Sequence, residues 1–397
     1  MVATRLYLRG KYSVKTSIME GFGRPSDGAS AVHLTKKLNR LTRLSLTRFR
    51  NYGQADFSFS DRVVAVCGLN GTGKTNLLDS IHYLCLTKSY FSRNDPGSVQ
   101  RGAQGFRIAG EWDTYDGILQ TACILRETGR KEFHAGGVPL TRFSSHVGRI
   151  PVVFVAPDDV QLIIGGSEER RRLMDAILSQ MDGEYLQSLI RYNRLLLDRN
   201  SLLKRAAETG GVDEALLDVM DMQLSAPGDL IHARRRELFE SYGPTALGFY
   251  ASISGGRETP ELSYTSPLSE KPMAEWLAAG RREDLAAQRT RQGIHRDDIE
   301  IMMEGAAFRQ TASQGQRKSM LFAMKLAEFD ILEQRKGAPP VLLLDDVFEK
   351  LDEERMRNLL YRVCRQNRGQ VFLTDTHAGR MRDILSANGV DFQPVGL

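Results

Sequence analysis

The stretch VVAVCGLNGTGKT at positions 63–75 decides the fold. Its first five residues, 63–67, are continuously apolar, which is typical of a short strand buried on both faces. The next eight, Gly68–Thr75, match the pattern G-x4-G-K-[ST], and residues 76–86 carry apolar side chains at helical spacing. A glycine-rich turn that joins a buried strand to a helix predicts a phosphate-binding loop in an α/β fold.

The loop supplies the groups that a triphosphate needs. Its glycines let the backbone wrap close to phosphate oxygens, and the amides of Gly71, Gly73 and Lys74 then point inward at a helix N-terminus that favours an anion. Lys74 supplies a cation for the outer phosphates, and the Thr75 hydroxyl is a hard oxygen ligand for Mg²⁺. The residues expected to bind the nucleotide are Gly68, Leu69, Asn70, Gly71, Thr72, Gly73, Lys74, Thr75 and Asn76. Kinases, GTPases and motor ATPases share this loop, so it predicts nucleotide binding and no particular reaction.

A second element is the carboxylate pair that follows residues 341–344. These four apolar residues predict a buried strand, and Asp345 and Asp346 emerge at its C-terminal end, where ligands bind in open α/β sheets. We expect Asp345 to hold Mg²⁺ beside Thr75, and Asp346 to orient the attacking water or accept its proton. The catalytic set predicted from these motifs is therefore Lys74, Asp345 and Asp346.

A third element, Ala312-Ser-Gln-Gly-Gln316, precedes a long helical stretch. A Ser-x-Gly-Gln sequence at a helix N-terminus can make a second anion site. The phosphate held at Lys74 already has its own helix. The simplest explanation is therefore that Ser313 caps a nucleotide held by another copy of the chain; alone, Ser313 would be a plain helix cap.

The chain divides into four parts. Residues 1–40 are rich in Gly, Ser, Arg and Lys, and we expect a disordered basic extension or a start codon placed too far upstream, with a transit peptide as the alternative. Strand-like segments dominate 41–155, long helical segments fill 156–292, and strands and helices alternate in 293–397. This order predicts one α/β nucleotide-binding domain interrupted by a helical arm, with no separate domains in series.

The expected elements follow from periodicity and turn residues. The expected strands are 41–49, 56–59, 63–67, 298–303, 341–344 and 370–374, with several short strands in 105–155; the expected helices are 76–86, 168–182, 184–207, 212–249, 273–291, 313–334 and 352–366, punctuated by Gly183, Gly210-Gly211, Pro227-Gly228 and Pro244.

Composition excludes several classes. The 397 residues have a mean hydropathy of −0.33, and no window approaches a membrane span. The four cysteines lie far apart without a CxxC pair, which excludes a disulfide framework and a cysteine-based zinc site and suits a reducing cytosol. Residues 1–40 hold eight basic and two acidic side chains, which leaves 46 basic and 47 acidic residues in the rest. Nucleic-acid binding would therefore need a local basic patch.

Together the motifs resemble the ABC-type ATPase heads of the SMC class and, within it, the RecF family of bacterial recombination mediators. The resembling segments are 49–52 (FRNY), 68–79 (GLNGTGKTNLLD), 295–298 (HRDD), 312–316 (ASQGQ) and 343–352 (LLDDVFEKLD). The resemblance covers the chain from about Leu41 to its C-terminus. Residues 1–40 have no counterpart in the family, and Ile294 stands where proline is expected before His295. The resemblance implies an ABC-type P-loop ATPase head with a mixed sheet, interrupted by a helical arm.

The resemblance also implies roles for single residues. Ser313, Gly315 and Gln316 would contact the γ-phosphate across an ATP-sandwiched homodimer, Arg50 would add to the nucleotide contacts, and Leu351-Asp352 would be the D-loop beside the interface.

Two further family elements are less defined in this sequence. Thr374 and His377 are the candidates for the switch residue, and we place His377 with the catalytic set although a plain surface histidine is equally compatible. For the Gln-loop, Asp158, Asp159 and Gln161 remain alternatives.

The function implied by the resemblance is a slow, DNA-stimulated ATPase of recombinational repair and replication restart, with links to the SOS response. It would dimerise on ATP, clamp duplex DNA at gaps or single-strand/double-strand junctions, and act in the cytoplasm on the nucleoid with RecR, with RecO and RecA downstream. Asp346 is one methylene shorter than the glutamate of many relatives, which predicts slow hydrolysis. The alternatives are a nucleotide-gated scaffold for protein partners, in which hydrolysis is incidental, and a small-molecule kinase.

Basic side chains gather on the expected arm helices and are candidates for phosphate contacts without sequence preference. They are Arg170, Arg171, Arg172, Arg191, Arg194, Arg199, Lys204, Arg205, Arg234, Arg235, Arg236, Arg281 and Arg282. Acids interleave with them, so each run could equally be a solvated helix face.

Overall fold

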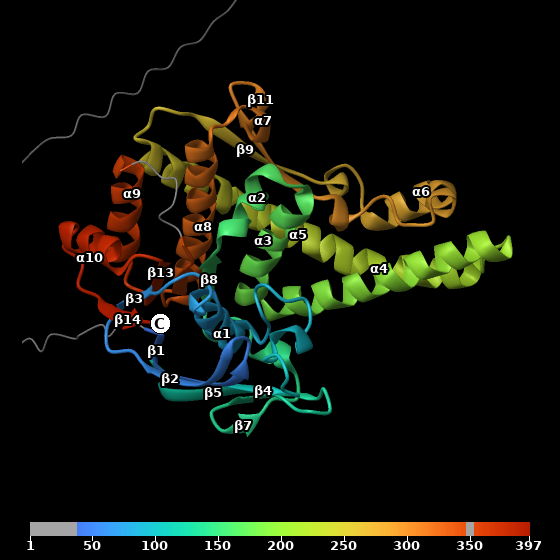
Figure 1. The fold of residues 1–397 in the computed structure, drawn as a ribbon. Helices are drawn as coiled ribbons and strands as arrows, with labels where there is room; N and C mark the ends of the chain where they lie inside the picture. Colours follow the sequence, from blue (N-terminus) through green and yellow to red (C-terminus); the bar gives the residue numbers. More distant parts are fainter. Residues whose placement is uncertain (1–37, 347–352) are drawn as a thin grey trace, which may run out of the picture. The chain divides into compact units, whose positions relative to one another are not determined.

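The computed structural model describes residues 38–346 and 353–397, which contain three sheets (Figure 1). The first is a five-stranded parallel sheet in the order β14-β3-β13-β12-β8. Its strands are β3 (Val63–Cys67), β8 (Val152–Val155), β12 (Val341–Leu344), β13 (Val371–Asp375) and β14 (Gln393–Gly396). The strands expected at 63–67, 341–344 and 370–374 are therefore confirmed. They are neighbours in the sheet, although Val63 and its partner Val371 are 308 positions apart (371 minus 63).

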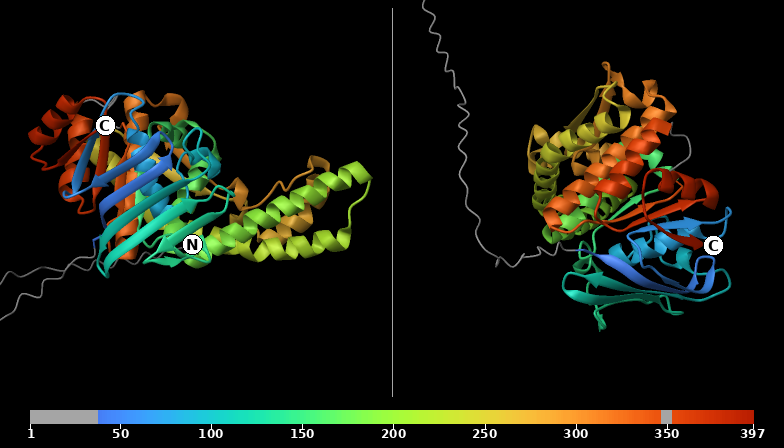
Figure 2. Two further views of the ribbon diagram at one scale, coloured as in Figure 1. Left: turned by 60° about the horizontal axis from the view of Figure 1, so that its bottom comes forward. Right: turned by 90° about the vertical axis from the view of Figure 1, so that its left-hand side faces the viewer.

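The second sheet is antiparallel, in the order β2-β1-β4-β5-β6-β7 (Figure 2). Its strands are β1 (Arg40–Phe49), β2 (Tyr52–Ser58), β4 (Phe106–Thr114), β5 (Gly117–Leu125), β6 (Lys131–Ala135) and β7 (Val138–Pro139). Turns with positive φ at Gly129, Gly136 and Gly137 separate the later strands. Parallel and antiparallel strands thus lie in separate sheets of one α/β head.

Helix α1 (Lys74–Leu86) lies between the first two sheets. Eleven of its residues are buried, so the helix is enclosed on nearly all sides. Val64 and Val66 of β3 face this layer, whereas Val63 and Ala65 face a second core under helix α8 (Gln314–Lys336). A strand covered on both faces explains the unbroken apolar run at 63–67.

The helical arm consists of α3 (Ser167–Met181), α4 (Gly183–Thr209), α5 (Glu214–Ser254) and α6 (Met273–Ala287). Helices α4, α6 and the first half of α5 run side by side (Figures 1 and 2). The second half of α5 packs on α8, where Tyr242 donates a hydrogen bond to the carbonyl of Met324 at 2.9 Å.

Helix α5 continues through Pro227 and Pro244, so the expectation that these prolines punctuate the helical stretch was wrong. Proline removes one backbone hydrogen bond and crowds the preceding turn. The helix persists because its buried face is held along most of its length, and Gly228 leaves room there for Met273 and Tyr192.

Several shorter elements connect the head and the arm or follow them. They are α2 (Gln161–Ile164), β9 (Pro260–Thr265), β10 (Asp298–Met303), β11 (Ala306–Ala307), α7 (Phe308–Thr311), α9 (Glu353–Leu360), a π-helical turn at Tyr361–Gln366, and α10 (Ala378–Ala387). Strands β11, β10 and β9 form a third, antiparallel sheet. Within the described ranges, none of the helices combines the length and apolar character that a membrane crossing requires.

Candidate nucleotide-binding site

The phosphate-binding loop lies between β3 and α1, as the sequence predicted. Gly71 and Gly73 adopt φ values of +83° and +115°, which residues with side chains rarely adopt. A Cβ on Gly73 would stand 2.6 Å from Asn51 Nδ2 and 2.8 Å from the Tyr52 hydroxyl. Backbone conformation and close packing therefore both require glycine at position 73.

Lys74 is almost fully buried and bends back over the loop. Its ammonium group donates to the carbonyls of Gly68 at 2.6 Å and Leu69 at 3.0 Å. Leu69, Asn70 and Gly71 are exposed, so the crest of the loop is open to solvent. The cation is thus held inside a loop whose outer side a triphosphate can approach.

The β1–β2 hairpin supports the loop from one side. Asn51 Nδ2 donates to the Thr72 carbonyl at 2.9 Å, and the Tyr52 hydroxyl donates to the Gly73 carbonyl at 3.0 Å. Asn76 Nδ2 donates to Asn51 Oδ1 at 2.8 Å. Burial raises the pKa of Tyr52 to about 12, which keeps this donor protonated. Sequence reasoning assigned no role to Asn51 or Tyr52, although both lie in the segment 49–52 on which the resemblance rested.

Arg50, the next residue of this hairpin, is directed to α1. Its Nη2 forms an ion pair with Asp79 at 2.8 Å and donates to Ser89 Oγ at 2.9 Å. Both partners lie in α1 or the loop after it, so the described hydrogen bonds place Arg50 beside the nucleotide loop's helix, and its expected nucleotide contact stays a prediction.

The carboxylate expected to hold Mg²⁺ lies beside the loop. Asp345 Oδ2 accepts a hydrogen bond from the Thr75 hydroxyl at 2.7 Å, and Oδ1 accepts one from the Thr374 hydroxyl at 2.7 Å. Burial raises the pKa of Asp345, while the bonds from Thr75 and Thr374 and the charge of Lys74 oppose the rise. Because a hydroxyl and a carboxylate oxygen converge there, the donor set fits a hard divalent cation.

Asp346 occupies a strained position after β12. Its φ is +48°, and its amide donates to the Thr374 hydroxyl at 2.8 Å. A non-glycine residue in this region costs free energy, and such strain gathers at functional sites. Thr374 therefore contacts both acidic residues, whereas His377 is exposed at the N-cap of α10 and its amide donates to Asp375 at 2.8 Å.

The Ser313 element caps α8, as its sequence indicated. Ser313 Oγ accepts from the Gln316 amide at 3.2 Å, and Gln316 Oε1 accepts from the Ser313 amide at 2.7 Å, which completes a reciprocal capping box. Gly315 is half-buried in the first turn of α8, where its carbonyl accepts a hydrogen bond from Ser319 Oγ at 3.0 Å. Figure 1 shows α7, directly before this turn, well apart from α1 and its phosphate loop. One chain thus brings Lys74, Thr75, Asp345 and Asp346 together and leaves the Ser313 turn elsewhere.

Two other expected elements have different outcomes. Leu351-Asp352, the expected D-loop, lie outside the described residues. Of the Gln-loop candidates, Asp159 accepts from the Tyr90 hydroxyl at 2.5 Å and from the Ala156 amide at 2.8 Å, while Asp158 and Gln161 are exposed.

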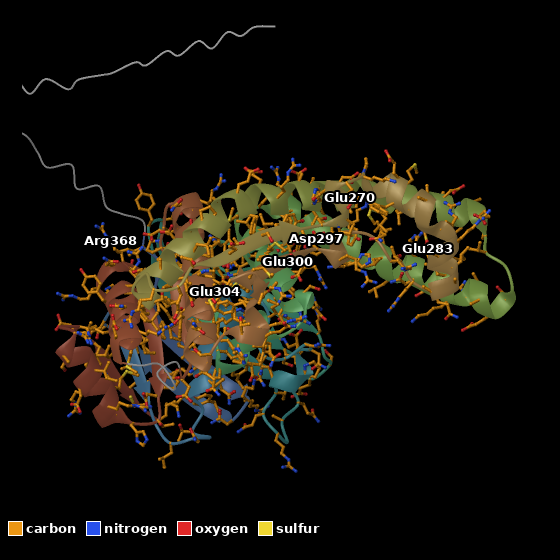
Figure 3. The ribbon with its side chains drawn as sticks, turned by 90° about the horizontal axis from the view of Figure 1, so that it is seen from above. Glu270, Glu283, Asp297, Glu300, Glu304 and Arg368 are labelled. Carbon is orange, nitrogen blue, oxygen red and sulfur yellow. The ribbon has the colours of Figure 1, made fainter. Side chains whose placement is uncertain are left out.

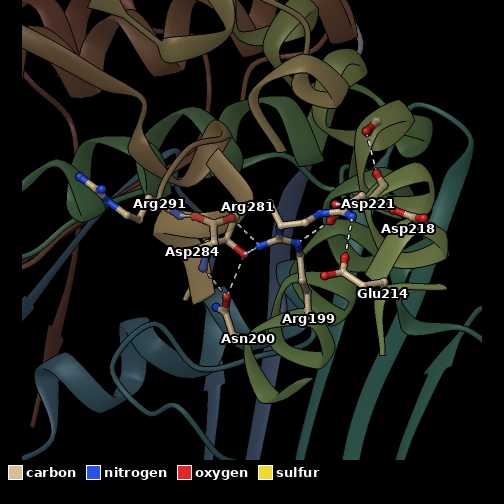
Figure 4. Close-up of polar contacts among 10 residues, drawn as sticks. Arg199, Asn200, Glu214, Asp218, Asp221, Arg281, Asp284 and Arg291 are labelled. Carbon is tan, nitrogen blue, oxygen red and sulfur yellow. Dashed lines mark hydrogen bonds and ion pairs between the residues drawn. The ribbon is translucent and has the colours of Figure 1, made fainter. Parts of the chain in front are cut away.

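Several arm arginines are buried in ion pairs. Arg199 is fully buried among α4, α5 and α6, where it pairs with Asp221 at 2.6 Å and Asp284 at 2.7 Å (Figure 4). Arg281 of α6 pairs with Asp218 and Asp221 of α5. These guanidinium groups hold the arm helices together. Arg199 is therefore excluded as a DNA contact because it is fully buried, whereas a DNA contact of half-buried Arg281 stays a prediction.

A similar cluster lies where the arm meets the head. Arg235 pairs with Asp175 at 2.8 Å and with Asp297, labelled in Figure 3, at 2.7 Å. Arg170 pairs with Asp298 at 2.7 Å. Arg170 and Arg235 are buried, so they too are excluded as DNA contacts. Two of their acidic partners, Asp297 and Asp298, belong to the HRDD segment, whose role the sequence did not reveal.

The exposed basic residues concentrate on α4. Arg191, Arg194 and Arg205 lie on one helical face at spacings of 3 and 11, and Lys204 is exposed beside them. Arg194 is 86% exposed, with Asp198 at 3.9 Å as an acidic neighbour. The other exposed or half-buried candidates are Arg171, Arg172, Arg234, Arg236 and Arg282.

Comparisons with known proteins agree with this architecture. Residues 43–133 match the family model described as an AAA domain. The chain is 38% identical over 352 residues to the DNA replication and repair protein RecF of Parabacteroides distasonis, covering 89% of this chain and 95% of that protein. It is 37% identical to the RecF of Flavobacterium johnsoniae, covering 87% and 97%.

Solved structures give the same result. The recombination mediator protein RecF with ATP, from the RecFOR pathway, superposes with a TM-score of 0.79 at 30% identity, covering 87% of this chain and 94% of that one. An Smc head bound to the C-terminal winged-helix domain of ScpA superposes with a TM-score of 0.53 at 17% identity over 90% of this chain, which is a likeness of fold alone.

The two sheets, the phosphate loop, the carboxylate strand and the helical insertion define the fold of an ABC/SMC-like ATPase head. Identity above 30% over most of both chains then assigns the family. The chain belongs to the RecF family of DNA replication and repair proteins.

Proposed function

We propose that this chain is an ATP-dependent DNA-binding protein of recombinational repair and replication restart, and that two copies sandwich each ATP. One observation supports this most directly. The phosphate loop and the carboxylates form a compact site, whereas the Ser313 turn, a capped helix N-terminus, lies apart from it in the same chain. A second copy could bring that turn onto the outer phosphate.

Within this site Mg²⁺ would be held by Thr75 and Asp345, where it would neutralise charge on the β- and γ-phosphates. Asp346 would orient the attacking water. Because its side chain is short, we propose slow hydrolysis, with ATP acting mainly as the switch for dimerisation. Thr374 is a stronger candidate than His377 for sensing the γ-phosphate, since its hydroxyl already contacts Asp345 and the amide of Asp346.

For DNA, we propose the basic face of α4, formed by Arg191, Arg194, Lys204 and Arg205. These side chains are exposed and would meet phosphates without reading bases. In this proposal residues 41–155 and 293–397 act as the ATPase head and 156–292 as the arm that clamps duplex DNA at gaps or junctions. The partners would be RecR, with RecO and RecA downstream, in the cytoplasm on the nucleoid; a solved relative named as a member of the RecFOR pathway supports this.

The test is molecular mass in solution with and without ATP and Mg²⁺. We expect the wild type to double in mass, whereas Lys74→Met, which lacks the phosphate cation, and Ser313→Arg, which blocks the second anion site, remain monomeric. A wild type that binds ATP and stays monomeric would refute the shared site.

Hydrolysis is then measured with and without duplex DNA. We expect DNA to stimulate the wild type but not Lys74→Met. If ATP causes dimerisation but duplex DNA leaves the rate of hydrolysis unchanged, the result would instead favour a nucleotide-gated scaffold for protein partners.

A further inference from the structure

Arg355 of α9 connects three parts of the head at the base of the Ser313 turn. Its Nη1 donates to Ser319 Oγ at 2.6 Å, and its Nη2 pairs with Glu258 Oε1 at 2.9 Å. Ser319 is fully buried in the second turn of α8 and donates to the Gly315 carbonyl at 3.0 Å. The guanidinium group of Arg355 is thus connected to the backbone of the Ser313 turn by two successive hydrogen bonds that meet at Ser319 Oγ.

Glu258 completes the connection from the other side. It accepts hydrogen bonds from the Tyr250 hydroxyl and from the Gln316 side chain in addition to Arg355. Burial would raise the pKa of Glu258, but the bonds from Tyr250, Arg355 and Gln316 lower it below its usual value, so the carboxylate stays charged. Gln316 is itself the residue that closes the capping box on Ser313.

The same cluster lies at the end of the long arm helix. Helix α5 has 41 residues and is therefore about 60 Å long. Near its start, Glu214 pairs with Arg281 of the arm; just after its end come Gly255 and then Glu258. Asn358 of α9 donates to the carbonyl of Ser252, which keeps α9 on this end of α5. A displacement of α5 would consequently move Glu258 and α9, and with them the contacts of Arg355.

We propose that Arg355 is a positioning residue that holds the Ser313 turn in the orientation needed to grip ATP bound to a second copy of this chain. The inference rests on the proposed function, since it assigns Arg355 to the contact made between copies. Arginine suits this role because one planar fork can satisfy Ser319 and Glu258 together, whereas lysine is a point charge. Through Glu258 and α5, the position of the arm would bias the same turn.

The experiment compares Arg355→Met and Arg355→Lys with Arg357→Met, an exposed arginine on the same helix. ATP affinity is measured on dilute monomer and dimerisation by molecular mass at rising protein concentration. We expect ATP affinity within about twofold of wild type for all three variants. We expect the ATP-dependent dimer of Arg355→Met to weaken by about tenfold or more, Arg355→Lys to be intermediate, and Arg357→Met to match wild type.

A mixing experiment tests action between copies. Arg355→Met retains a sound phosphate loop, and Lys74→Met retains a sound Ser313 turn, so a mixed dimer contains one complete site. We expect the mixture to hydrolyse ATP well above the sum of the two variants alone.

Three outcomes would overturn the inference. They are an Arg355→Met variant that dimerises like wild type, one that loses ATP affinity as a monomer, or a mixture without recovery. A wild type that does not dimerise on ATP would instead refute the proposed function, so the two failures are distinguishable.

Discussion

The hydroxyl of Thr75 donates a 2.7 Å hydrogen bond to Asp345 across 270 residues of sequence. This bond joins the first turn of α1 to the end of β12, and it brings a hydroxyl and a carboxylate oxygen to one point. Since Mg²⁺ prefers such oxygens, the expected metal position is defined by two residues from distant segments of the chain.

Replacing Asp345 by asparagine should therefore abolish the effect of Mg²⁺ on the affinity of the protein for ATP. The amide preserves the size of the side chain but removes the charge that a divalent cation needs. We expect wild type to bind ATP at least about tenfold more tightly with Mg²⁺ than with EDTA, and Asp345→Asn to bind equally in both. Titration of a fluorescent ATP analogue measures this. Asp391→Asn, remote in sequence and exposed, is the control that should retain the Mg²⁺ effect.

Thr374→Val should reduce hydrolysis more than ATP binding. Valine keeps the shape of threonine but removes the hydroxyl that bridges Asp345 and the amide of Asp346. Because small misplacements of a catalytic group are costly, we expect turnover to fall by about tenfold or more, with ATP affinity within about twofold. Single-turnover hydrolysis and equilibrium titration separate the two effects. Equal losses in Thr374→Val and in the neighbouring Thr376→Val would contradict a specific role.

The parts of the site that the sequence predicted are those encoded in short segments. A buried strand and a tight loop need particular residues in a row, so a short segment is enough to predict them. This holds for the apolar run 63–67, the glycine spacing of 68–75 and the acids after 341–344. Thr374 and Tyr52 act through contacts with distant segments, and nothing in their immediate neighbours shows this. The resemblance pointed to 49–52 and to Thr374 but could not rank the residues within them.

Two features of the fold were hidden for other reasons. Strand β14 reads Gln-Pro-Val-Gly, without alternation, because it is an edge strand that tolerates proline. Helix α5 includes Pro227 and Pro244 because tertiary packing outweighs local propensity. Likewise, buried Arg199 and exposed Arg194 lie five residues apart in similar sequence, and only packing distinguishes them.

These two arginines should give opposite phenotypes. Arg199→Met leaves Asp284 buried without its cation and leaves Asp221 with Arg281 as its cationic partner, which should lower the free energy of unfolding by about 3–5 kcal/mol. Arg194→Met should change it by less than about 0.5 kcal/mol but weaken binding to duplex DNA and flatten its salt dependence by about one charge. Urea unfolding and DNA titration at several salt concentrations measure the pair. A DNA defect confined to Arg199→Met, at temperatures where it is folded, would place the DNA elsewhere.

Stability should fall on mild acidification because desolvation lowers the pKa of His82, His146, His232 and His295 and holds them in the neutral form. Burial, the largest cause in each case, lowers the pKa of His82 to about 3 and those of His146 and His295 to about 4. An unfolded histidine titrates near pH 6.5, so below that pH the unfolded state binds protons that the folded state does not.

The stability contributed by these groups is therefore fully present above about pH 6.5 and is lost as the pH falls towards 4. At pH 5.5, His82, His146 and His295 should each cost about 1.4 kcal/mol relative to pH 7.5, or about 4 kcal/mol together. Urea unfolding at both pH values gives the difference. His146→Gln, which removes one of these groups, should reduce the loss by about 1.4 kcal/mol, whereas exposed His377→Gln should leave it unchanged. An equal loss in all three proteins would show that other groups, and not the buried imidazoles, govern acid stability.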